Sequence, residues 1–153
     1  MKSIATGAKV ILLLGATLDF NPAYADNCSG YDSFVQTTVH TADLGKGMTL
    51  TILEASSIVT SGDSKYNLVT GGCSGTVLSN PDGTVQSSGY CARRDKDGDL
   101  SSLEWMQAAG SDKGTWKATG GTGKFAGKGD TGWYQSVVSD GKIGVSKWGG
   151  NCR

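Results

Sequence analysis

The chain has two prolines and one histidine in 153 residues. So little proline excludes collagen-like and proline-rich disordered proteins, although glycine is abundant at 24 residues. The one histidine, His40, has no partner for a zinc site, and no Cys-x-x-Cys spacing supports one. An excess of positive charge is also missing, because 14 Lys and Arg face 14 Asp and Glu. Nucleic acid and anionic membrane surfaces are therefore poor candidate partners.

The chain also lacks an apolar run long enough to span a bilayer. The N-terminal run Val10–Leu18 covers nine residues, whereas a membrane-spanning helix needs about 20. It follows two lysines and precedes Ala23-Tyr24-Ala25, the pattern of a secretory signal peptide and its cleavage site. We therefore predict a cleaved signal peptide at residues 1–25, one domain at residues 26–153, and export to the periplasm or the medium.

All four cysteines follow the predicted cleavage site, and an even count in an exported chain indicates disulfides. Between Cys73 and Cys91 lies Asn80-Pro81-Asp82-Gly83, a strong turn signal. If Asn80 faces Thr84 across a three-residue loop, Cys73 and Cys91 also face each other, because each lies seven residues from the loop. Cys28 and Cys152 remain as the second pair, near the two ends of the domain.

No long helical period appears after residue 25. Short alternating or β-branched runs are separated by Gly, Asn and Asp turns, a spacing typical of β-sandwiches and β-barrels. Hairpin-length connections favour an antiparallel up-and-down order. The eight predicted strands are Phe34–Thr41, Met48–Val59, Lys65–Ser79, Thr84–Arg93, Leu100–Ala108, Gly114–Thr119, Gly127–Ser139 and Lys142–Trp148. These patterns alone leave a sandwich and a barrel equally open.

The run Gly120-Gly121-Thr122-Gly123-Lys124-Phe125-Ala126-Gly127 resembles the glycine-rich turn signature of the allene oxide cyclase/dirigent superfamily and its small secreted bacterial relatives. The strand Gly89-Tyr90-Cys91 and the acidic turn that follows it are similar to a pattern in those bacterial relatives. The resemblance covers Met48–Trp148. It implies an all-β, antiparallel, eight-stranded up-and-down barrel of the calycin type, in which a Cys28–Cys152 bond would join the first and last strands.

The same resemblance implies a homo-oligomer, a trimer or dimer, that steers reactive small molecules in an apolar cavity without a cofactor. The catalytic residues of the plant members match no position here, so that activity is an analogy at the level of the fold.

The acidic turn Asp95-Lys96-Asp97-Gly98-Asp99 begins like a calcium loop, with carboxylates at the first, third and fifth positions. The later positions do not match, because Leu100 stands where the loop needs glycine and Met106 where it needs a bidentate acid. Two interpretations remain: Asp95, Asp97 and Asp99 bind calcium, or they shape a solvated hairpin turn.

Glu54 continues an apolar row of alternating residues that begins at Met48. If that row faces the interior, Glu54 is a candidate acid/base or ligand anchor. The alternative is that Glu54 reaches solvent at the end of its strand.

Aromatic side chains must supply much of the core or line a cavity, and we expect Phe125 to plug one end of the barrel. We predict a small apolar molecule as the ligand, with Glu54, Trp105, Trp133 and Tyr134 as contacts and no cofactor. Because no recognisable catalytic set is present, binding ranks first. The alternatives are a cofactor-free cyclase or isomerase that uses Glu54, and a ligand-free structural or interaction module.

Overall fold

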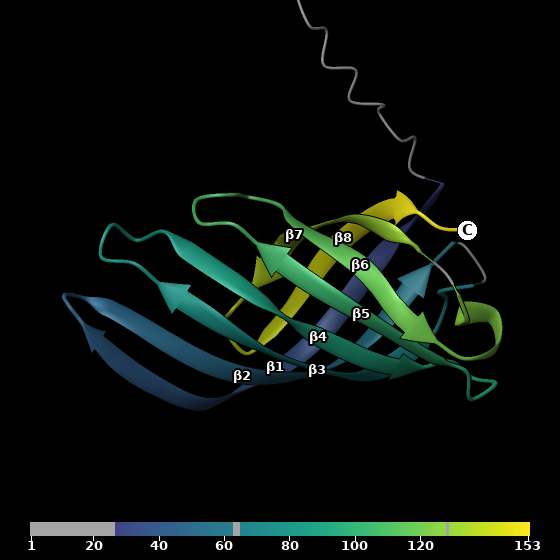
Figure 1. Cartoon of the computed structure of the whole chain (residues 1–153), viewed down its shortest axis with the longest axis horizontal. Helices are drawn as coiled ribbons and strands as arrows, with labels where there is room; N and C mark the ends of the chain where they lie inside the picture. Colours follow the sequence, from purple (N-terminus) through teal and green to yellow (C-terminus); the bar gives the residue numbers. More distant parts are fainter. Residues whose placement is uncertain (1–26, 63–64, 128) are drawn as a thin grey trace, which may run out of the picture.

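The computed structural model describes residues 27–62, 65–127 and 129–153, so the predicted signal peptide lies outside the described residues. Eight antiparallel strands form a closed barrel in chain order, because β1 pairs with both β2 and β8 (Figure 1). The predicted all-β, eight-stranded, up-and-down barrel is therefore confirmed. The strands are β1 Cys28–Gly45, β2 Met48–Ser61, β3 Val69–Ser79, β4 Val85–Arg94, β5 Leu100–Gln107, β6 Gly114–Gly121, β7 Thr131–Ser139 and β8 Ile143–Asn151, with a short 3-10 helix η1 at Gly123–Phe125.

The largest differences from the predicted strands lie at the ends of β1, β3 and β7. β1 begins at Cys28 rather than Phe34, because residues 28–35 pair with β8 to close the barrel. β3 begins at Val69 rather than Lys65, since Lys65 to Leu68 form a turn. Leu68 has a φ of 59°, a left-handed conformation that does not continue a strand. β7 likewise begins at Thr131, after the loop that follows η1.

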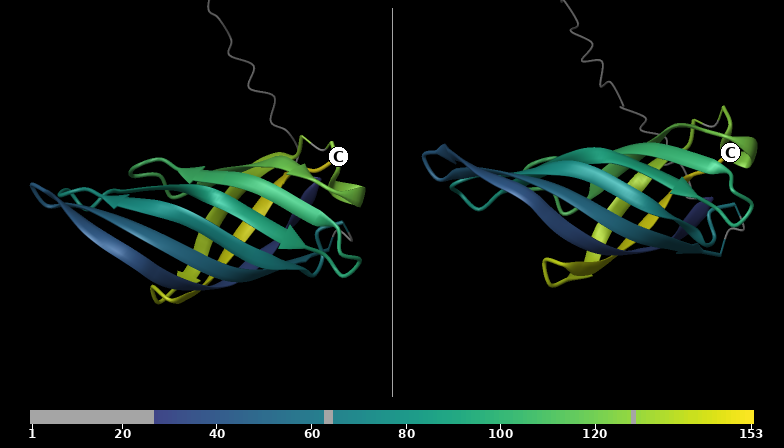
Figure 2. Two further views of the ribbon diagram at one scale, coloured as in Figure 1. Left: turned by 60° about the horizontal axis from the view of Figure 1, so that its bottom comes forward. Right: turned by 90° about the horizontal axis from the view of Figure 1, so that it is seen from below.

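The barrel is elongated, and its two ends differ. The β1–β2 and β3–β4 hairpins extend at one end, while the C-terminus, η1 and the start of β1 lie at the other (Figures 1 and 2). We call these the hairpin end and the terminal end. Strand pairing slips at Thr38/His40 in β1 and at Ser136/Val138 in β7. Each bulge inserts one residue and reverses which alternate side chains face inward beyond it.

Both predicted disulfides are present. Cys73 and Cys91 are directly opposed in the β3–β4 ladder, with Cα atoms 4.0 Å apart. Cys28 and Cys152 join the two ends of the domain, with Cα atoms 5.9 Å apart. The second bond covalently fastens the start of β1 to the residue that follows β8, at the seam where the barrel closes.

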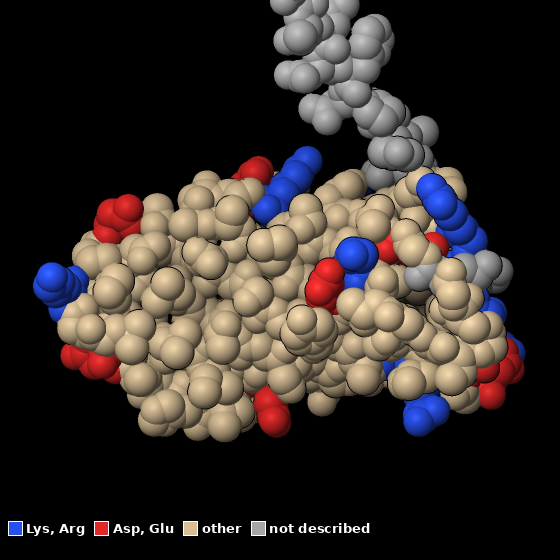
Figure 3. All heavy atoms as spheres, viewed as in Figure 1, with Lys and Arg blue, Asp and Glu red and all other residues tan. Residues whose placement is uncertain are grey.

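Charged side chains of both signs are scattered over the outer surface. In the view of Figure 3, Lys and Arg alternate with Asp and Glu toward the two ends, and no patch of one sign forms. This agrees with the equal numbers of acidic and basic residues. Within the described ranges, no helix is long and apolar enough to cross a membrane.

Candidate functional site: a cavity inside the barrel

The barrel encloses a cavity of about 300 Å³. Its wall is mostly apolar and includes Phe34, Leu103, Trp105 and Trp116. Ser136 and Ser139 of β7 also line it and are solvent-exposed, so the cavity opens toward the β7–β8 turn. The barrel is therefore not filled completely by its own side chains.

The terminal end is closed by packed aromatic rings. Tyr66 contacts Trp148 edge-on, with ring centroids 5.7 Å apart, and Phe125 with centroids 5.5 Å apart. Trp116 and Trp148 make a second edge-on contact at 6.1 Å. Phe125 is 2 % exposed, which confirms that it plugs this end of the barrel.

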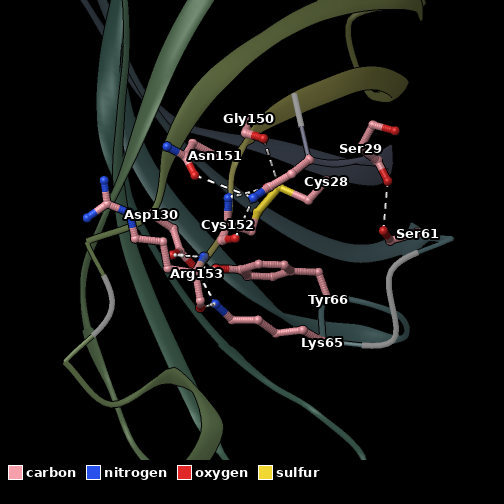
Figure 4. The surroundings of a disulfide bond; sticks show 11 residues. Cys28, Ser29, Ser61, Lys65, Tyr66, Asp130, Gly150, Asn151, Cys152 and Arg153 are labelled. Atoms are coloured by element: carbon pink, nitrogen blue, oxygen red, sulfur yellow. Dashed lines mark hydrogen bonds and ion pairs between the residues drawn. A yellow bond between two sulfur atoms is a disulfide. The ribbon is translucent and has the colours of Figure 1, made fainter. Parts of the chain in front are cut away.

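A buried carboxylate ties this plug to the C-terminus (Figure 4). Asp130 is fully buried, and its Oδ2 accepts a hydrogen bond from Lys65 Nζ at 2.5 Å and another from the Tyr66 hydroxyl. Its Oδ1 accepts the backbone N–H of Arg153 at 2.8 Å. Burial alone would raise the pKa of Asp130, but the hydrogen bonds from Lys65 and Tyr66 lower it below its usual value. Asp130 is therefore held as a carboxylate.

A polar group interrupts the apolar wall of the cavity. Arg93 of β4 donates from Nη2 to Asp32 Oδ2 at 2.5 Å, and the same nitrogen lies 3.4 Å from Cys73 Sγ. Burial raises the pKa of Asp32, and the neighbouring guanidinium of Arg93 offsets only part of that rise. The cavity thus contains an ion pair whose acid is easier to protonate than an exposed aspartate.

Several buried polar atoms on the cavity wall have no hydrogen-bond partner among the described residues. They are Arg93 Nε, Trp116 Nε1 and Trp148 Nε1. Asp32 and Tyr134 have hydroxyl neighbours, Ser57 and Ser87, whose hydrogen bonds partly offset the rise in their pKa values. Buried polar groups are normally paired, and an unpaired one costs about 1–3 kcal/mol. Three such N–H donors around one cavity, beside the Asp32 carboxyl group, favour an occupant that carries a polar group.

Two of the predicted contact residues line the cavity. The rings of Trp105 and Tyr134 pack edge to face on the cavity wall, with ring centroids 6.4 Å apart. Burial raises the pKa of Tyr134 to about 12, so the phenol is neutral at physiological pH. The ring of Tyr134 sits over Gly114, where an added Cβ would lie 2.1 Å from the ring. Glycine is therefore required at position 114, beneath the Tyr134 ring.

The other two predicted contact residues lie outside the cavity. On β2 the inward residues are Leu53, Ala55 and Ser57, so Glu54 between them points outward and is exposed. Glu54 therefore reaches solvent, as the alternative expected, but from the middle of β2 and not from a strand end, and its carboxylate does not reach the cavity. Trp133 also points outward, where Lys113 Nζ lies 5.0 Å from its ring centroid.

The acidic turn is organised by Asp95. Its Oδ1 accepts the backbone N–H groups of Asp97 and Asp99, both at 2.9 Å, and its Oδ2 lies 2.6 Å from Lys124 Nζ. The hydrogen bond from Lys124 lowers the pKa of Asp95. Over residues 27–62, 65–127 and 129–153, no three metal-ligating side chains gather into a group that could hold an ion. The hairpin-turn interpretation describes these contacts, and the calcium site stays a prediction.

Asp32 and Arg93 were not among the residues predicted from the sequence. Asp32 lies before the predicted start of the first strand, in a stretch without apolar alternation. The position of Arg93 could have been predicted, because Arg93 lies two residues after Cys91 and therefore on the same face of β4 as the predicted disulfide.

No protein-family model matches the chain, and no curated protein matches it. Among the solved structures, the chain is similar to the pterocarpan synthase dirigent protein GePTS1. The two share 16 % sequence identity and a TM-score of 0.48, over 80 % of this chain and 85 % of the other. At this level of similarity, no family membership, activity or substrate follows for this chain.

Proposed function

We propose that this protein binds one small, largely apolar molecule inside its barrel and anchors a polar group of that molecule at Asp32 and Arg93. The observation that carries the proposal is the cavity itself, an apolar space with three unpaired N–H donors on its wall. Sites for small molecules are commonly apolar pockets with a few polar groups that fix orientation. A volume of about 300 Å³ lies at the small end of such sites.

The polar anchor has a defined chemistry. Arg93 Nε supplies a donor, while Asp32 Oδ1 supplies an acceptor when ionised and a donor when protonated. A ligand group with both a donor and an acceptor, such as a hydroxyl, satisfies both atoms. The aromatic rings of Trp105 and Tyr134 would then contact the apolar part of the ligand.

A second candidate function is a cofactor-free cyclase or isomerase. It is favoured by one observation: a buried acid with a raised pKa faces the cavity beside a cation. Such a group can exchange a proton with a bound substrate. In this version the acid/base is Asp32, because Glu54 faces away from the cavity.

Binding can be tested with the fluorescent apolar probe N-phenyl-1-naphthylamine. We expect its emission to rise in the presence of the protein and to saturate at one probe per barrel. Replacing Leu103, a wall residue, with Trp should fill part of the cavity and weaken binding at least tenfold. The matched control is Glu54→Gln on the outer face, which should bind the probe as the wild type does. Equal binding by wild type and Leu103→Trp, with both folded by circular dichroism, would place the probe elsewhere and refute the proposal.

The cellular setting follows the sequence-based predictions. We propose export to an oxidising compartment, since two disulfides fit such a compartment. Periplasmic fractionation of a tagged full-length chain, with mass spectrometry of its N-terminus, tests cleavage after residue 25. A trimer or dimer is tested by light scattering of the purified protein.

A further inference from the structure

The Cys73–Cys91 disulfide faces the cavity rather than the outer surface. Both cysteines line the cavity, while their neighbours Gly72 and Ser74 on β3 point outward. Cys91 is 5 % exposed, and Cys73 is half-buried. A small molecule that enters the barrel therefore meets this bond from the cavity side, where Cys73 is the more exposed of the two cysteines, whereas a protein surface does not.

The two sulfur atoms have different surroundings. Arg93 Nη2 lies 3.4 Å from Cys73 Sγ, and no such contact reaches Cys91 within the described residues. A guanidinium beside a sulfur stabilises the thiolate form of that sulfur. When a disulfide is attacked, the sulfur that is more stable as a thiolate leaves faster. The contact with Arg93 therefore predicts that Cys73 is the leaving group when a thiolate attacks this disulfide.

The second disulfide provides an internal comparison. Cys28 is 4 % exposed and belongs to the aromatic cluster at the terminal end, and neither Cys28 nor Cys152 lines the cavity. The nearby cation, Lys65, is bonded to Asp130 and to the carbonyl oxygen of Arg153 (Figure 4), just as Arg93 is bonded to Asp32, but no hydrogen bond joins Lys65 to a cysteine sulfur among the described contacts. Each disulfide has one buried and one partly exposed cysteine, and the two bonds differ in that only Cys73–Cys91 lines the cavity.

We propose that the Cys73–Cys91 disulfide is a thiol–disulfide exchange site for low-molecular-mass thiols that enter the barrel cavity. A small thiolate R–S⁻ attacks Cys91 Sγ, an R–S–S–Cys91 bond forms, and the Cys73–Cys91 bond breaks. Cys73 leaves with the electron pair as a thiolate beside Arg93. A second thiolate can then attack the sulfur of the bound R group, which releases R–S–S–R and the Cys91 thiolate. Two small thiols are thereby oxidised, and the protein disulfide is reduced by two electrons.

This inference does not depend on the proposed ligand. Exchange requires that a small thiol enters the cavity, whereas the proposed function requires that an apolar molecule remains bound there. Probe binding without exchange refutes only the exchange site, and exchange without probe binding refutes only the binding function.

The experiment uses the native full-length mature protein and 2-mercaptoethanol as the thiol. Samples are quenched at intervals with excess iodoacetamide, digested and mapped by mass spectrometry. We expect alkylated Cys73 and a 2-mercaptoethanol adduct on Cys91 to appear first, while Cys28–Cys152 stays intact. Labelling of Cys28 and Cys152 at the same rate, or an adduct on Cys73 with alkylated Cys91, overturns the proposal.

Two variants test the role of the guanidinium. Arg93→Met keeps much of the side-chain volume but removes the charge, and we expect adduct formation to slow roughly tenfold. Arg93→Lys restores a cation, and the rate should lie between those of Arg93→Met and wild type. An unchanged rate in folded Arg93→Met refutes the role of Arg93. If Arg93→Met does not fold, the order of labelling in the wild type still decides the proposal.

Discussion

Replacing Asp130 with Asn tests how the terminal end of the barrel is held together. Asn keeps the shape of the side chain and can still accept the N–H of Arg153, but its amide nitrogen cannot accept hydrogen bonds from Lys65 and Tyr66. Removing one partner of a buried ion pair costs about 3–5 kcal/mol. The Lys65 side chain is 16 % exposed, so solvent recovers part of the loss. We therefore expect the lower limit, about 3 kcal/mol.

In a domain of this size, about 3 kcal/mol lowers the melting temperature by roughly 10 °C. The assay is thermal unfolding followed by circular dichroism at pH 7. Asp97→Asn is the matched control, because the Asp97 side chain is 56 % exposed and its ion pair with Lys96 lies on the surface; we expect it to melt close to wild type. If Asp130→Asn melted like this control, the stabilising role of the buried carboxylate would be refuted.

The same variant should change the dependence of stability on pH. The folded pKa of Asp130 lies below the unfolded value of about 3.9. Its contribution is therefore complete above about pH 4 and is lost as the pH falls through the folded pKa. We expect the unfolding free energy of the wild type to fall more steeply below about pH 4 than that of Asp130→Asn. Parallel acid transitions would contradict the lowered pKa.

Four further predictions concern the cavity wall, the seam where the barrel closes and the acidic turn. Gly114→Ala should displace the Tyr134 ring, seen as a changed near-ultraviolet circular dichroism spectrum and a lower melting temperature, because the added Cβ would lie 2.1 Å from that ring; an unchanged spectrum counts against the packing described. Tyrosine absorbance at 295 nm should show an ionisation near pH 12 that is lost in Tyr134→Phe. Because the folded pKa is raised, Tyr134 should make stability fall as the pH rises from about 10 to 12. The double substitution Cys28→Ala, Cys152→Ala opens a link across 124 residues and should cost about 4–5 kcal/mol in urea unfolding, and a loss under about 1 kcal/mol would refute this. Asp95→Ala should lower the melting temperature through loss of its turn contacts; wild-type stability that responds to Ca²⁺ and to EDTA would instead support the calcium site.

The sequence predicted the strands and their pairing where turn chemistry was explicit. The Asn80-Pro81-Asp82-Gly83 turn set the register of β3 and β4 and thereby paired Cys73 with Cys91. The closure of the barrel was harder to predict, because β1 begins in a polar stretch where pairing with β8, not apolar alternation, defines the strand.

The candidate site was predicted only in part, because alternation does not say which face of a strand points inward. On β2 the row with Met48 and Glu54 is the more apolar of the two, yet the cavity is lined by the row with Leu53. Asp32 escaped prediction because a buried acid breaks the alternation that marks a strand. Its partner Arg93 lies far along the chain, and only the closed barrel brings the two together.

Native mass spectrometry of the protein, purified without denaturant from its periplasmic or secreted fraction, tests the central claim most directly. We predict a mass above that of the oxidised chain, with the excess released as one small, largely apolar molecule on denaturation. The excess should be lost in Leu103→Trp and kept in Glu54→Gln. A bare oxidised mass in the wild type, together with no saturable uptake of N-phenyl-1-naphthylamine, would contradict a ligand-binding barrel.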